Sequence, residues 1–259
     1  MSAPIVELQG VSRTHDCGGK RVTVLDRIDL SIREGDLVAI VGPSCSGKSA
    51  LLSLIAGIDR PTAGRIVVSG LDLASSSASA LTAWRRRAVG VVFQLDQLIP
   101  FLSAAENVEL ALLPLPMAKT ERRARSLAAL SLVGLAQRAR RYPRELGQDE
   151  NRRLAVARAL VTDPRIIVAD EPTARLDRGH VQETLALLER WSEQLGRTVV
   201  VGTGDPGVAL RARTRYHIAE GALMAWGCPP ETTPSTLRLP CCAAARRASD
   251  AEPVCVGLR

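Results

Sequence analysis

The chain has 259 residues, of which 46% are hydrophobic but only 3% are aromatic. This length allows one sizeable core, which must be built from aliphatic side chains. No stretch approaches the roughly 18 consecutive apolar residues of a membrane-spanning helix, and the first residues lack the basic and apolar regions of a secretory signal. We therefore expect a soluble intracellular protein.

The basic residues are almost all arginine, because only Lys20, Lys48 and Lys119 are lysines, and the formal net charge is +7. The arginines cluster at 85–87, 122–125 and 138–141. Such clusters can bind nucleic acid or anionic membranes. No aromatic residues interleave them to stack on bases, which favours a solvated surface and no nucleic-acid partner.

Apolar runs predict the strands, and helical periodicity predicts the helices. The predicted strands are 5–9, 22–32, 37–41, 66–69, 89–93, 166–169, 198–201 and 216–219. The predicted helices are 48–56, 104–113, 120–133, 150–162 and 178–196. Several strands are continuously apolar, which is typical of a buried parallel sheet. The order is β-rich, then helix-rich, then alternating, and it predicts an α/β core interrupted by a helical insertion.

The predicted domains follow from this order. Residues 1–94 and 163–227 form the α/β core, and residues 95–162 form the helical subdomain. Residues 228–259 are rich in Pro, Thr, Ala, Cys and Arg without apolar periodicity, so we expect a flexible tail. Four of the six cysteines lie in this tail, and the absence of any Cys-x-x-Cys pair argues against a zinc site.

The stretch "VAIVGPSCSGKSALL" follows a predicted strand and opens a predicted helix. It matches G-x-x-x-x-G-K-[ST], in which backbone N–H groups and a helix N-terminus hold phosphates. Lys48 is expected to reach the β- and γ-phosphates, and Ser49 to bind Mg²⁺. The predicted nucleotide-binding residues of this phosphate loop are Gly42, Pro43, Ser44, Cys45, Ser46, Gly47, Lys48, Ser49 and Ala50.

Cys45 occupies a position that is often glycine in such loops, so its side chain could restrict the backbone. A thiol near a helix N-terminus tends to have a lowered pKa. Two interpretations stay open: a thiol-reactive group that controls nucleotide access, and a tolerated small residue.

An acidic pair follows the four apolar residues "IIVA". The strand would place Asp170 and Glu171 at the carboxyl edge of the sheet, beside the phosphate loop. Asp170 is predicted to order the Mg²⁺ shell, and Glu171 to polarise an attacking water.

Together with these motifs, the segments "VGVVFQLDQLIPFLSAAENVEL", "YPREL", "LAVARAL", "VADEPT" and "ARLD" resemble the nucleotide-binding domain of ABC transporters, in particular the lipoprotein-releasing and macrolide-export branch. The resemblance covers about residues 4 to 227. It implies a P-loop core with a mixed sheet flanked by helices, and Gln94 as a catalytic and Mg²⁺-binding glutamine. It also implies head-to-tail dimerisation, ATP and Mg²⁺ as cofactors, and a membrane-spanning permease as partner.

Three positions depart from the family pattern. The signature Leu-Ser-Gly-Gly-Gln is replaced by "LGQDE" at residues 146–150, which we call the acidic signature. Gly204 stands where the family has its switch histidine. The adenine-stacking aromatic aligns with His15, which can still stack. The resemblance therefore implies a chain that has lost several groups around the γ-phosphate.

The acidic signature raises an electrostatic question. We expect Asp149 to cap the following helix, since aspartate is a favoured N-cap. Its carboxylate would then occupy the N–H groups that a γ-phosphate needs, and two like charges 4 Å apart repel by roughly 4 kcal/mol at an effective dielectric of 20. Arg152 and Arg153 lie just behind and could offset this repulsion.

Three functions remain open from the sequence. The first is the ATP-binding subunit of an ABC export or release system, an ATPase with an atypical site whose hydrolysis is slow or depends on its partner. It would act as a homo- or heterodimer in the cytoplasm, on the inner face of the cell membrane. The second is a catalytically impaired pseudo-ATPase that clamps nucleotide. The third, a DNA- or ribosome-associated ABC protein, is disfavoured by the single cassette.

Overall fold

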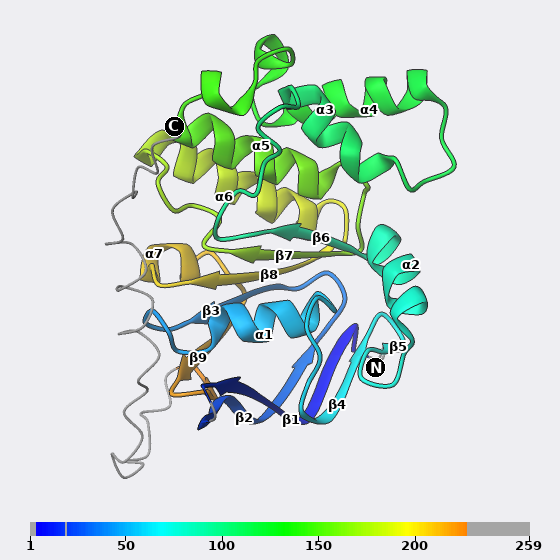
Figure 1. Cartoon of the computed structure of the whole chain (residues 1–259). Helices are drawn as coiled ribbons and strands as arrows, with labels where there is room; N and C mark the ends of the chain where they lie inside the picture. The colour runs from blue at the N-terminus through cyan, green and yellow to red at the C-terminus, as the bar shows by residue number, and fades with distance from the viewer. Residues whose placement is uncertain (1–3, 19, 227–259) are drawn as a thin grey trace, which may run out of the picture.

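The computed structural model describes residues 4–18 and 20–226, so the predicted tail lies outside the described residues (Figure 1). The strands are β1 (Val6–Cys17), β2 (Lys20–Ile32), β3 (Leu37–Val41), β4 (Ala63–Val68), β5 (Leu71–Asp72), β6 (Val89–Val92), β7 (Ile166–Asp170), β8 (Thr198–Thr203), β9 (Thr214–Ala219) and β10 (Ala222–Ala225). The α-helices are α1 (Lys48–Ile55), α2 (Ala78–Ala88), α3 (Ala104–Glu109), α4 (Lys119–Leu132), α5 (Gln148–Leu160), α6 (Arg178–Glu193) and α7 (Pro206–Ala209).

The larger sheet has the order β10-β9-β3-β8-β7-β6. Strands β9, β3, β8, β7 and β6 run parallel, and β10 pairs antiparallel with β9. Every residue of β3 and β8 is buried, which explains the apolar run of β3 and the three successive valines of β8. The predicted mixed sheet is confirmed.

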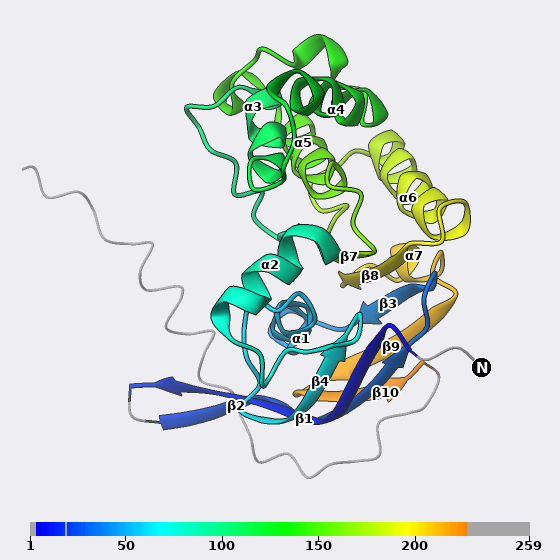
Figure 2. The same cartoon turned by 90° about the vertical axis from the view of Figure 1, so that its right-hand side faces the viewer.

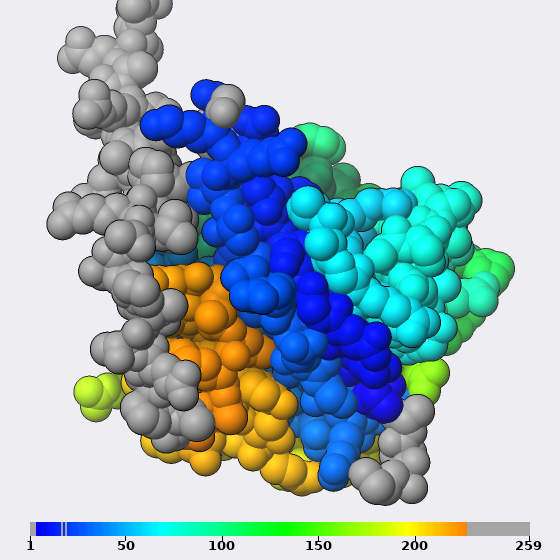
Figure 3. Space-filling model, turned by 90° about the horizontal axis from the view of Figure 1, so that it is seen from below, coloured from blue at the N-terminus to red at the C-terminus, as the bar shows by residue number. Residues whose placement is uncertain are grey.

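A second, antiparallel sheet has the order β2-β1-β4-β5, and the sequence did not predict it as separate. Helix α1 lies between the two sheets (Figure 2), and its apolar side chains join those of β1, β2 and β4 in one core. Seen from below, β1 and β2 lie beside β9 and β10 (Figure 3). The Asp26 N–H donates to the Gly221 carbonyl at 3.0 Å and links the two sheets.

Helices α3, α4 and α5 lie between β6 and β7 in the sequence, although β6 and β7 are neighbours in the sheet. Three 3-10 turns, Leu110–Leu112, Ala136–Arg138 and Pro143–Glu145, complete this segment. The segment stacks above the larger sheet (Figure 1), and its apolar faces share a core with α6, β3 and β8. The placement agrees with a helical insertion, while the division into separate domains stays a prediction.

Within residues 4–18 and 20–226, no helix combines the length and the apolar character needed to cross a bilayer.

Candidate functional site

The phosphate loop connects the end of β3 to the start of α1, as predicted. Two glycines give it its shape. A Cβ on Gly42 would collide with the Ile218 carbonyl oxygen of β9 and lie 2.7 Å from Ser46 Oγ. Gly47 has a φ of +108° and precedes the first helical residue, Lys48. Only glycine meets both conditions without strain, so the loop is tightly wound against the sheet.

Lys48 is the central cation of the site, and its side chain is only 8% exposed. Its Nζ donates to the carbonyl oxygens of Gly42 at 2.7 Å and Pro43 at 2.9 Å. The same Nζ lies 3.8 Å from Glu171 Oε1. A buried charge needs such partners, and here they hold the ammonium group inside the curve of the loop.

The remaining loop residues differ in exposure. The Ser46 hydroxyl is buried and has no hydrogen-bond partner within the described part of the chain. Ser44, Cys45 and Ser49 are exposed, whereas Ala50 packs against the core between the sheets. Cys45 has a φ of +64°, a left-handed conformation that a residue with a side chain adopts less easily than glycine. The expected backbone restriction therefore applies at this position. Its proposed thiol reactivity stays a prediction.

The two carboxylates lie at the carboxyl end of β7, next to β8. Asp170 ends β7, and its Oδ1 lies beside Gly202, where the α1 residue Leu52 also packs. Glu171 Oε1 accepts a hydrogen bond from the Gly204 N–H at 2.8 Å, and Thr203 Oγ1 donates to Oε2 at 3.3 Å. The structure therefore brings Lys48, Glu171 and Gly204 together.

Gln94 and His15 belong to two other parts of the fold. Gln94 is separated from the end of β6 by Phe93, it is exposed, and its carbonyl accepts a hydrogen bond from Arg152. His15 is partly buried in β1 opposite Val22 of β2. Strand β2 also touches the loop, since a Cβ on Gly47 would lie 2.9 Å from Leu25 Cδ2. The roles of His15 and Gln94 stay predictions.

These residues fit a nucleoside triphosphate with Mg²⁺. The phosphate loop has no room for a Cβ at Gly42 or Gly47. It holds the buried ammonium group of Lys48 and the buried hydroxyl of Ser46, and this hydroxyl has no partner among the described residues. Phosphate oxygens suit both groups. The predicted metal ligands Ser49, Gln94 and Asp170 each carry a side-chain oxygen, the kind of ligand atom that Mg²⁺ prefers.

The predicted cap of the acidic signature is wrong. Helix α5 begins at Gln148, and its N-cap is Gly147. Glu150 Oε2 reaches back to accept a hydrogen bond from the Gly147 N–H at 3.0 Å, because a glutamate at the third helical position can do so. Asp149 instead faces Arg153, with 3.2 Å between Oδ2 and Nη2. Glu150 also pairs with Arg138 at 3.2 Å. Both acidic groups are thus neutralised by arginines of the same chain.

The sequence did not predict that the acidic signature lies close to the start of α6. Asp177 caps α6 by accepting from the His180 N–H at 2.9 Å, and its Oδ2 lies 2.8 Å from His180 Nδ1. These bonds to His180 lower the pKa of the Asp177 carboxyl. His180 Nδ1 also lies 3.8 Å from Asp149 Oδ2. An aspartate before a helix is an N-cap signal, but the contact with Asp149 has no local signal.

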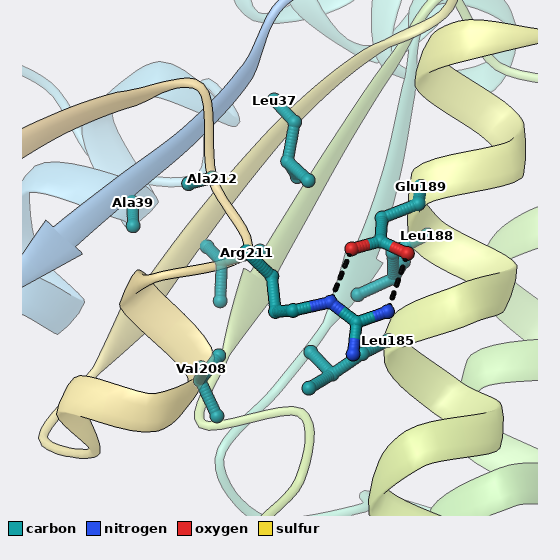
Figure 4. Close-up of a pocket in the computed structure, with 9 residues that line it drawn as sticks. Leu37, Ala39, Leu185, Leu188, Glu189, Val208, Arg211 and Ala212 are labelled. Carbon is teal, nitrogen blue, oxygen red and sulfur yellow. Dashed lines mark hydrogen bonds and ion pairs between the residues drawn. The ribbon is translucent and has the colours of Figure 1, made fainter.

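A cleft on the α6 side of the larger sheet lies apart from the phosphate loop (Figure 4). Its lining is apolar, with Leu37, Leu185 and Val208 among the side chains that face it. Arg211 closes one edge through a two-bond pair with Glu189, at 2.5 and 2.7 Å. Its polar groups bind each other, so this cleft adds nothing to the candidate site.

Comparisons with known proteins agree on one family. The sequence model described as "ABC transporter" matches residues 25–174. The "Macrolide export ATP-binding/permease protein MacB" of Sodalis glossinidius is 40% identical over 252 residues, which are 97% of this chain and 38% of that protein. The chain thus spans about two fifths of that relative's length.

A second relative and a solved structure match over nearly their whole lengths. The "Lipoprotein-releasing system ATP-binding protein LolD" of Bordetella avium is 41% identical, over 83% of this chain and 93% of that protein. The ATP-binding cassette MJ0796, solved as a dimer bound to ADP and Pi, is 37% identical with a TM-score of 0.82, covering 84% of this chain and 96% of that one.

Proposed function

The chain belongs to the ABC transporter family of ATP-binding cassettes, as its motifs indicated, and on this premise we propose that it binds ATP·Mg and couples ATP hydrolysis to a membrane-embedded permease. The observation that carries the proposal is the meeting of Lys48, Glu171 and Gly204. Lys48 Nζ lies 3.8 Å from Glu171 Oε1, which accepts from the Gly204 N–H at 2.8 Å. A phosphate-binding cation and a general base therefore share one centre.

Each residue has a role that its position supports. Bound ATP·Mg supplies the phosphoryl group and the metal charge that offsets the phosphate oxygens. Lys48 and the loop N–H groups bind the phosphates, with Ser49, Gln94 and Asp170 as oxygen ligands on the metal side. Glu171 accepts a proton from water at a carboxylate oxygen, and the Gly204 N–H orients that carboxylate. His15 offers a ring face on which the adenine base could stack.

The partners follow from the relatives. One of them is named as an ATP-binding and permease protein in one chain, and another as the ATP-binding protein of a releasing system. We propose that this cassette works as a head-to-tail homo- or heterodimer on a membrane-spanning permease, and that it lies on the inner face of the cell membrane. The acidic signature of one chain would then face the phosphate loop of the other.

The binding half of the proposal is tested with Lys48→Ala. The variant should lose most of its ATP·Mg affinity in calorimetry, because the ammonium group that pairs with the phosphates is removed. Lys119→Ala is the matched control, since Lys119 is an exposed lysine at the start of α4. Equal affinities of Lys48→Ala and the wild type would reject the phosphate-loop assignment.

The hydrolysis half is tested by phosphate release at saturating ATP·Mg, with and without the co-purified permease. Glu171→Gln is the blank, because it keeps the shape of the side chain and removes its basicity. Turnover that depends on Glu171 supports an ATPase. Tight ATP binding with the same release rate in wild type and blank, even with the permease present, would favour the pseudo-ATPase.

A further inference from the structure

Arg152 is a buried cation whose contacts the proposed function has not yet used. Its side chain is 2% exposed, and it lies in the second turn of α5, just after the acidic signature. Burial lowers the pKa of this guanidinium, and the Asp96 carboxylate acts in the opposite direction. Arginine remains a cation with planar donor groups in such settings, so its partners define what it does.

Those partners are main-chain groups beside the candidate site. Arg152 donates to the carbonyl oxygens of Phe93, of Gln94 at 2.9 Å and of Glu171 at 3.0 Å. Its Nη1 also lies 3.0 Å from Asp96 Oδ1. Phe93 and Gln94 follow β6, Glu171 follows β7, and these strands are neighbours. One guanidinium therefore ties together the two places where Gln94 and Glu171 leave the sheet.

The backbone of Glu171 needs such support. Its φ is +49°, a left-handed conformation that is unfavourable for a residue with a side chain. Such conformations persist only where the surroundings fix them on several sides. The Glu171 N–H donates to the Gly202 carbonyl at 2.8 Å, and Arg152 holds the Glu171 carbonyl from the other side. The Glu171 backbone is thus held in part by a side chain of α5.

Arg158 provides a contrast within the same helix. It donates to the carbonyl oxygens of Gln97 at 2.7 Å and Asp96 at 2.8 Å. It therefore also ties α5 to the segment after β6, but none of its described contacts involves Gln94 or Glu171. Comparing the two arginines separates general anchoring of this segment from positioning of the site.

We propose that Arg152 is a positioning residue that sets Gln94 and Glu171 from the helix carrying the acidic signature, so that a movement of α5 shifts both side chains together. The inference rests on the proposed function, in which Gln94 faces Mg²⁺ and Glu171 faces water. It assigns the link between α5 and the two site residues to one arginine of the same chain.

The test compares Arg152→Gln, Arg152→Lys and Arg158→Gln with the wild type. ATP affinity is measured by calorimetry with Mg²⁺ and with a chelator, phosphate release is measured at saturating ATP·Mg, and Tm is recorded for each. Arg152→Gln should keep the Mg²⁺-free affinity, lose most of the gain that Mg²⁺ gives, and slow phosphate release on the order of 10- to 100-fold, since small misplacements of catalytic groups cost this much.

The controls make the inference falsifiable. Arg158→Gln should keep the Mg²⁺ gain even if its Tm falls as far as that of Arg152→Gln. Arg152→Lys keeps the positive charge but loses the planar guanidinium donors, so its Mg²⁺ gain and its phosphate-release rate should lie between those of the wild type and Arg152→Gln. If Arg152→Gln does not fold, Arg152→Lys takes its place in the comparison. Equal losses of Mg²⁺ gain in the Arg152 and Arg158 variants, or none in either, would overturn the proposal. If the wild type releases no phosphate even with the permease present, hydrolysis is rejected, while the Mg²⁺ comparison still decides the role of Arg152.

Discussion

Asp149 and Arg153 form an ion pair across one turn of α5, with Asp149 Oδ2 3.2 Å from Arg153 Nη2. Arg153 also donates to the Val133 carbonyl at 2.8 Å, so its guanidinium is anchored where the carboxylate can reach it. An acid four residues before a base is the favourable order on a helix. The repulsion expected between Asp149 and a γ-phosphate is therefore weakened by a cation of the same chain.

This pair predicts a measurable coupling. In a double-mutant cycle of Asp149→Asn and Arg153→Gln, the free energy of unfolding should show a coupling of about 0.5 kcal/mol, typical of i,i+4 pairs that keep some solvent contact. Urea unfolding in low and high salt measures it, and high salt should reduce it. A coupling of zero would mean that Arg153 does not stabilise the Asp149 carboxylate.

Gly204 should accept a side chain. A Cβ there would lie 3.6 Å from Glu171 Oε1 and 3.7 Å from the Gly42 carbonyl, both ordinary contacts. Gly204→Ala should therefore leave Tm nearly unchanged. The neighbouring Gly202 is the matched contrast, because its Cβ would lie 2.6 Å from Leu52 Cδ1. Gly202→Ala should cost roughly 1–3 kcal/mol, as overpacking does. A large loss in Gly204→Ala would show that this strand end is tighter than described.

Restoring both lost motifs should act as a unit. Gly204→His adds a donor for the γ-phosphate, and Ser-Gly-Gly-Gln at 147–150 restores the signature. Loss of one preorganised donor costs on the order of 10²–10³ in rate, and in a homodimer each composite site lacks both elements. The combined variant should raise phosphate release by more than the product of the single changes, with Glu171→Gln as the blank.

Within the acidic signature, the effect of replacing Gly147 depends on the side chain at position 149. A Cβ on Gly147 would lie 2.8 Å from Asp149 Oδ1. Gly147→Ser alone should therefore displace the Asp149 carboxylate and lower Tm by disturbing its pair with Arg153, whereas Gly147→Ser with Asp149→Gly leaves no carboxylate to collide with the new side chain. Robust wild-type turnover that Glu171→Gln abolishes would instead show that the acidic signature is competent as it stands.

The start of α3 predicts a pH dependence of stability. The Ser103 hydroxyl and N–H donate to Glu106 Oε2 at 2.6 and 2.8 Å, and these bonds lower the pKa of Glu106. A lowered folded-state pKa stabilises the protein above the unfolded pKa, and this contribution is lost as the pH falls through the folded pKa. Glu106→Gln should be less stable than wild type at pH 7, and the difference should shrink below about pH 4. Urea unfolding across this range measures it.

The sequence predicted the elements whose signal is local. The boundaries of β3 agree with its apolar run, and α1 begins at Lys48 as the phosphate-loop pattern requires. Helix α2 was missed because only Leu81 and Ala88 of its residues are buried, so the helix shows little apolar periodicity. The short strands β5 and β10 were missed because they are too brief to form a pattern.

The site was predictable where one segment supplies it. Lys48 begins α1, Asp170 ends β7 and Glu171 follows it, as a strand and its following turn predicted, while their roles stay predictions. The contacts of Arg152 were not, since its acceptors Gln94 and Glu171 come from segments that only the sheet brings together. The predicted cap of α5 was wrong because the helix begins at Gln148, which places Asp149 inside its first turn and lets Glu150 reach back to the Gly147 N–H.

The position of β3 has a consequence for how the chain acquires its shape. This strand carries the phosphate loop, and both its neighbours in the sheet, β8 and β9, come from the last part of the described chain. Contacts between distant segments form late, because the intervening chain must be ordered first. A nascent chain emerging from the ribosome therefore cannot seat this strand before β8 has been made. Until then, the apolar residues of β3 are an exposed, aggregation-prone segment.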